Sequence, residues 1–142
     1  MPTPADIQTA NGGTTAGRAE GGDTVTFTFA GPVAPALVLA GWTGAAAPVT
    51  VHFDHEGARS TLGVEDATGD VITALGSVDL AAHYANAVDF AGSTMTASGN
   101  TIAVVLGTPS IGGLHTISIP TMMTWTAPNG SASESGPPDV EF

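Results

Sequence analysis

The chain lacks cysteine and lysine, and it has few aromatic side chains. With no Cys among its 142 residues, disulfides and thiolate metal sites are excluded. Only 2 basic residues stand against 13 Asp and Glu, so the formal net charge is −11. Because nucleic acids and anionic membranes are bound through basic patches, this balance speaks against both as partners.

Long apolar runs are also missing. The longest, Val33–Trp42, is about half as long as a membrane-spanning helix needs and contains Pro35. Met1–Gln8 has neither the basic nor the apolar region of a signal peptide. We therefore expect a protein that stays where it is made, or leaves by cell lysis, or is a module of a larger secreted chain.

The sequence does contain short runs in which apolar and polar residues alternate. These runs are separated by Gly and Pro, which number 19 and 10. Asp23–Ala30 places Val25, Phe27 and Phe29 on one face and three Thr on the other. This period of two is typical of a half-buried strand. Pro32–Trp42 instead indicates a short helix or turn.

Comparable runs predict the remaining strands at Pro48–Asp54, Ser60–Asp66, Val71–Leu80, Ala85–Phe90, Thr94–Ser98, Thr101–Leu106 and Thr121–Thr126, with a last edge strand at Val140 and Phe142. Many short strands divided by turn signals indicate an all-β, immunoglobulin-like antiparallel β-sandwich. Its core is predicted to contain Val25, Phe27, Phe29, Val51, Phe53, Val104 and Leu106. Residues 23–142 would form this one domain, and the polar residues 1–22 a flexible N-terminal arm.

Four segments of the chain carry a family resemblance. They are GDTVTFTFAGPVAPALVLAGWTG (Gly22–Gly44), SGNTIAVVLGT (Ser98–Thr108), MTWTAP (Met123–Pro128) and ESGPPDVEF (Glu134–Phe142). Together they resemble the bacterial Ig-like domains of actinobacterial surface proteins and phage virion proteins. The resemblance implies a sandwich that serves as a spacer, an adhesin or a virion surface decoration.

The densest polar group of the sequence consists of His52, Asp54, His55 and Glu56. Two His and a carboxylate could bind a divalent metal. A polar hairpin at the end of a strand accounts for the same residues, and we favour it because short motifs match often by chance.

A second acidic group, Glu65, Asp66 and Asp70, flanks a Thr-Gly turn and is a weak candidate for Ca²⁺. Its spacing does not match an EF-hand loop, so a solvated turn is favoured here too. We accordingly expect no metal and no cofactor.

The sequence contains few patterns that are typical of a catalytic site. No Ser lies in a G-x-S-x-G motif, and no nucleophile stands at a readable spacing from a base. The sequence thus predicts a protein that is not an enzyme.

Four residues are candidates for assembly contacts: Pro4, Ile7, Trp42 and Tyr84. Pro4 and Ile7 carry the little apolar surface of the arm. For Trp42 we favour packing in the core at one end of the sandwich over an exposed contact, and Tyr84 suits either role. We expect a virion structural protein that binds other virion proteins or copies of itself. The alternative is an adhesion or spacer module at a bacterial cell surface.

Overall fold

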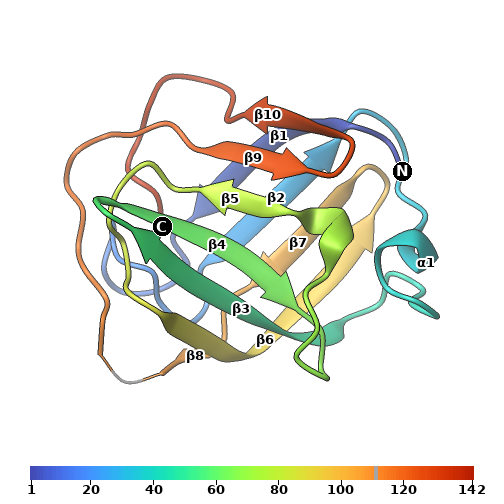
Figure 1. Cartoon of the computed structure of the whole chain (residues 1–142), viewed down its shortest axis with the longest axis horizontal. Helices are drawn as coiled ribbons and strands as arrows, with labels where there is room; N and C mark the ends of the chain where they lie inside the picture. Colours follow the sequence, from blue (N-terminus) through green and yellow to red (C-terminus); the bar gives the residue numbers. More distant parts are fainter. Residues whose placement is uncertain (111) are drawn as a thin grey trace.

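The structure, a computed structural model, describes residues 1–110 and 112–142 and is built almost entirely of β-strands (Figure 1). The strands are β1 (Pro4–Ala10), β2 (Thr24–Phe29), β3 (Ala47–Glu56), β4 (Arg59–Glu65), β5 (Ser77–Asp79), β6 (Val88–Ser98), β7 (Thr101–Val105), β8 (Thr108–Pro109), β9 (Thr124–Ala127) and β10 (Gly130–Ser133). A short helix, α1 (Pro35–Val38), and a 3-10 turn, η1 (Thr73–Leu75), complete the described elements. The prediction of an all-β class is confirmed.

All strand pairs are antiparallel, and they form one continuous path in the order β1-β2-β7-β6-β3-β4-β5-β9-β10, with β8 on β6. The sheet rolls up, so that the two ends of the path, β1 and β10, lie side by side in Figure 1. The result is a flattened near-barrel. The immunoglobulin-like arrangement, which has two separate sheets, stays a prediction.

The seam between β1 and β10 is closed by side chains. The Ser135 backbone N–H donates to Asp6 Oδ1 at 2.7 Å, and the Gln8 amide donates to the Ser135 carbonyl at 3.1 Å. At the other end of the seam, the Asn129 amide donates to the Met1 carbonyl at 2.9 Å. Side-chain bonds thus join two strand edges that already have a backbone partner on their other side.

Alternation in the sequence decides which side chains fill the interior. All seven residues predicted to face inward are buried: Val25, Phe27, Phe29, Val51, Phe53, Val104 and Leu106. At the centre, the Trp125 ring meets Phe27 and Phe29 edge-on, with centroids 5.0 and 4.9 Å away. The Trp125 indole N–H donates to the Leu75 carbonyl at 2.6 Å, which satisfies its one polar atom.

The arm expected over residues 1–22 is wrong, because Pro4–Ala10 forms β1 and pairs with β2. Two interactions order a segment whose composition suggests disorder. The Ile7 side chain is fully buried in the core. The buried Asp23 carboxylate accepts the backbone N–H groups of Gly12, Gly13 and Glu20 at 2.8 to 3.0 Å. The domain boundary expected at residue 22 therefore falls inside one continuous sheet.

Other strand limits differ in smaller ways. The two strands expected within residues 85–98 form the single strand β6, and Val71–Leu80 divides into η1 and β5. The loop predicted at Pro128–Pro138 contains β10, which makes a hairpin with β9. In place of a last edge strand, Asp139 makes an isolated bridge with Thr121, and Phe142 packs into the core.

Candidate functional site

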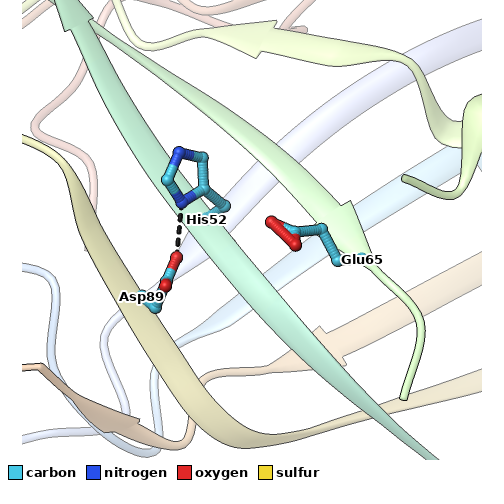
Figure 2. A group of neighbouring side chains, drawn as sticks. All are labelled: His52, Glu65 and Asp89. Atoms are coloured by element: carbon cyan, nitrogen blue, oxygen red, sulfur yellow. Dashed lines mark hydrogen bonds and ion pairs between the residues drawn. The ribbon is translucent and has the colours of Figure 1, made fainter. Parts of the chain in front are cut away.

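His52, Glu65 and Asp89 form a polar cluster on the outer face of the sheet, which we call the surface triad. One potential ligand atom of each lies within 4.8 Å of the others. Figure 2 shows the His52 ring on β3, with Asp89 reaching it from β6 and Glu65 approaching from β4. Three neighbouring strands thus bring together a group that is dispersed in the sequence.

The pairing of the strands explains this geometry. His52 and Asp89 are direct cross-strand partners, and His52 Nδ1 contacts Asp89 Oδ1. On the other flank, the partner of His52 is Gly63, which leaves open space beside the ring. The His52 and Asp89 side chains are 38% and 55% exposed. An imidazole and two carboxylates can bind a transition metal. An exposed His–Asp ion pair also occurs without any metal, and such a pair contributes little to the stability of the fold.

The sequence named two of these residues in separate groups. The sequence groups His52 with Asp54, His55 and Glu56, and Glu65 with the acidic turn that follows it. In the structure, the Asp54 carboxylate accepts the adjacent His55 N–H at 2.8 Å and stays on the exposed hairpin. Asp89 was missed, because only strand pairing brings it near His52.

The acidic turn is organised around Asp66. Its carboxylate accepts the Thr68 hydroxyl at 2.7 Å, the Thr68 N–H at 2.8 Å and the Asp70 N–H at 3.0 Å. The Thr68 hydroxyl, followed by these backbone groups, lowers the pKa of Asp66. Hydrogen bonds within the turn therefore explain the position of the Asp66 carboxylate without an ion. Glu65 does not join this group and belongs to the surface triad.

The four expected assembly contacts lie inside the chain, so the prediction that they form a contact surface is wrong. Pro4, Ile7, Trp42 and Tyr84 are all buried. Trp42 donates its indole N–H to the Ala45 carbonyl at 2.6 Å. The large apolar side chains that the structure does leave exposed include Ile119, Leu37 and Val71, at 72%, 62% and 60%.

A second carboxylate group, which we call the C-terminal cluster, consists of Glu134, Asp139 and Glu141. Their oxygens also lie within 4.8 Å of one another. Glu134 and Glu141 are only 4% and 1% exposed, whereas Asp139 is exposed. The cluster lies where the segment after β10 returns towards β1.

Neighbouring groups fix the two buried carboxylates. Glu134 Oε1 accepts the Met123 N–H at 2.8 Å, and Glu141 Oε1 accepts the Thr9 hydroxyl at 2.6 Å. The Glu141 N–H donates to the Tyr84 hydroxyl at 2.8 Å. Burial raises the pKa of Glu141 to about 8, raises that of Glu134, and raises that of Tyr84 to about 12.

Three histidines also gather on the surface, and sequence reasoning missed this row. The His83 ring lies between His55 and His115, with centroid distances of 5.2 and 4.6 Å. The Asn86 side-chain oxygen lies 2.8 Å from His83 Nε2 and fixes the central ring. Because the three residues come from three different segments, no local spacing could have revealed the row.

A cavity of about 330 Å³ is lined by Met1, Thr73, Ala74, Pro128 and Asn129. None of these side chains forms an acid–base pair, and the cavity contains no member of the surface triad or the C-terminal cluster. Of the clusters described, the C-terminal one has the most unusual electrostatics, because its carboxylates are buried.

Comparisons with protein-family models, with curated proteins and with solved structures find no match to this chain. No helix within residues 1–110 and 112–142 is long and apolar enough to cross a membrane. The likeness to bacterial Ig-like domains accordingly stays a prediction from the sequence.

Proposed function

We propose that the chain is a non-enzymatic structural module of a phage virion surface, such as a capsid decoration or a head or tail structural protein. The observation that carries the proposal is a solid interior. Trp125, Phe27 and Phe29 meet at the centre of the rolled sheet, where a ligand-binding barrel would have a cavity. A filled barrel suits a rigid part that presents its outer surface.

Charge adds to this proposal. The chain carries 13 acidic residues against 2 Arg, and Asp54, Asp70 and Asp89 are among the acidic side chains exposed at the surface. An acidic outer face keeps a displayed module soluble and repels other polyanions. Its partners would be other virion proteins or copies of itself, met through neutral or apolar contacts. Ile119 and Leu37 are available for such a contact.

The alternative is an adhesion or spacer module at a bacterial cell surface. It is supported by the resemblance of Gly22–Gly44 and Glu134–Phe142 to Ig-like domains of surface proteins. The N-terminal segment does not discriminate between the two roles, because its order comes from the pairing of β1 with β2 within the same sheet. The two roles differ in where the protein is found rather than in its fold.

Fractionation of the producing culture distinguishes the two. Particles and cell walls are purified separately, washed with salt to remove weakly bound acidic protein, and analysed by quantitative mass spectrometry. We expect the chain in the particle fraction at a fixed ratio to the major particle proteins. Recovery in the cell-wall fraction alone would support the alternative and contradict the virion proposal.

A matched pair of variants tests the contact surface. Replacing Ile119, which is exposed, by Ser should leave the fold intact and lower incorporation into particles if the apolar loop makes the contact. Thr116→Ser, in the same exposed loop, is the control for handling and expression. Equal incorporation of the two variants would remove Ile119 from the contact.

A further inference from the structure

The C-terminal cluster of Glu134, Asp139 and Glu141 brings three acidic side chains together, two of them in the interior and one at the surface. Glu134 and Glu141 are almost fully buried, and their oxygens and those of Asp139 lie within 4.8 Å of one another. Burying even one carboxylate is strongly unfavourable unless a counter-charge compensates it. Two buried carboxylates with a third beside them need such a counter-charge more than any other group described.

No basic side chain in the described part of the chain supplies that charge. The ion pairs recorded there join His52 to Asp89 and Arg59 to Asp79, away from the cluster. The neighbours of the cluster are neutral: the Thr9 and Tyr84 hydroxyls and the Met123 N–H. Neutral donors orient the carboxylates without neutralising them.

One atom of the cluster lacks any partner. Glu141 Oε2 is buried and makes no hydrogen bond, although Oε1 of the same carboxylate accepts the Thr9 hydroxyl at 2.6 Å. Buried polar atoms are nearly always satisfied, and an orphan among them indicates a bound ion, water or proton. The orphan oxygen belongs to the group whose ligand atoms converge with those of Glu134 and Asp139.

We propose that Glu134, Asp139 and Glu141 bind a calcium ion. All three donors are hard carboxylate oxygens, which Ca²⁺ prefers, and none is a nitrogen or sulfur ligand. Two oxygens on one Ca²⁺ can be at most about 5 Å apart, twice the metal–oxygen distance, and the observed separation fits this limit. The exposed Asp139 marks the side from which the ion and its remaining water ligands enter.

The proposed ion would connect distant parts of the fold. Glu134 follows β10, Glu141 is bonded to Thr9 on β1, and Asp139 bridges to Thr121 before β9. Calcium would therefore fix the segment after β10 against β1 and against the residues that precede β9. This role is independent of whether the chain is mounted on a virion or on a cell wall.

The test uses the whole chain, freed of metal by chelator and then titrated with CaCl₂ to about 10 mM, above the millimolar affinity of weak extracellular sites. Binding is measured by calorimetry and the melting temperature by circular dichroism. We expect one site and a rise in Tm of about 5–10 °C at saturation, because the ion binds only the native state. Mg²⁺ at the same concentration should act more weakly, because it demands a stricter geometry.

Variants locate the site. Glu141→Gln keeps the buried shape and removes a charge, and Asp139→Asn does so at an exposed position that the fold tolerates. Both should lose the calcium-dependent rise in Tm. Glu65→Gln, in the surface triad, is the matched control and should keep it.

Three results would overturn the proposal. The first is a wild-type Tm that does not respond to calcium. The second is a response that Glu141→Gln and Asp139→Asn keep and Glu65→Gln loses, which would assign the ion to the surface triad. The third is a Glu141→Gln variant more stable than wild type in chelator, with no calcium binding by either protein. That result would show that a proton shared between the carboxyl groups, and not a calcium ion, holds the cluster together.

Discussion

Asp23 Oδ1 accepts the backbone N–H of Gly12 at 2.8 Å, across the loop that joins β1 to β2. The same carboxylate also holds the N–H groups of Gly13 and Glu20, so one buried side chain orders most of the connection. A Gly-rich segment needs such a partner, because its backbone loses much entropy on folding.

We expect Asp23→Ala to lower the free energy of unfolding by about 2–4 kcal/mol, since several charge-assisted hydrogen bonds are lost together. Urea denaturation followed by fluorescence measures the change. Asp54→Ala is the control, because Asp54 is exposed and bonds only its neighbour His55. Equal stability of the two variants would show that the loop is not organised by Asp23.

Ile7 tests whether the N-terminal segment belongs to the core. Ile7→Ala should cost about 2–5 kcal/mol, as truncation of a buried aliphatic side chain does, because Ile7 is fully buried in β1. Leu37→Ala, at a side chain 62% exposed, should change stability by less than about 0.5 kcal/mol. A negligible effect of Ile7→Ala in thermal and chemical unfolding would restore the idea of a loose arm.

Phe27 tests the centre of the sheet. Phe27→Ala should lower stability by about 3–5 kcal/mol, because it leaves a cavity against the Trp125 ring 5.0 Å away. The near-ultraviolet signal of Trp125 should weaken in the same variant. Thr26→Ala, on the opposite face of β2, serves as the control. A loss under about 1 kcal/mol for Phe27→Ala would place the ring outside the core.

The acidic turn makes a specific prediction on pH. Hydrogen bonds, first from the Thr68 hydroxyl, lower the native pKa of Asp66, so the unfolded chain takes up the proton first as the pH falls. The contribution of Asp66 is therefore complete above the unfolded pKa of about 3.9 and is lost as the pH falls through the lowered native pKa. The Tm difference between wild type and Asp66→Ala should accordingly be larger near about pH 6 than near about pH 2.5.

Thr68→Val should reproduce part of this pH dependence, because it removes the hydroxyl that is the largest cause of the shift. Melting curves of the three proteins across the acid range provide the measurement. A difference that stays constant with pH would mean that the turn stabilises the fold without favouring the ionised carboxylate.

The strands and their inward faces could be predicted because alternation is local. Val25, Phe27 and Phe29 show their face within a run of five residues, and the structure buries all three. The role of β1 could not be predicted, because a mostly polar strand lacks a clear alternating pattern and is recognised only by its pairing with another strand. Its order depends on Ile7 reaching the core and on Asp23 bonding the loop.

The surface triad and the C-terminal cluster could not be predicted either, because their residues meet only through contacts between distant parts of the chain. His52 and Asp89 are 37 positions apart, and Thr9 and Glu141 are 132 positions apart. Residue type alone could not show that Glu134 and Glu141 are buried, because acidic residues near loops are usually exposed. Only the return of the last segment towards β1 makes them neighbours.

The seam between β1 and β10 also determines where the native protein should open first. Asp6, Gln8 and Asn129 close it through side chains, without the repeated backbone ladder that joins β3 to β6. Local opening there breaks few bonds, so it should cost less free energy than global unfolding. In native-state hydrogen exchange we expect the amides of β10 to exchange well before those of β3 and β6. Uniform protection across all three strands would mean that the barrel opens only as a whole.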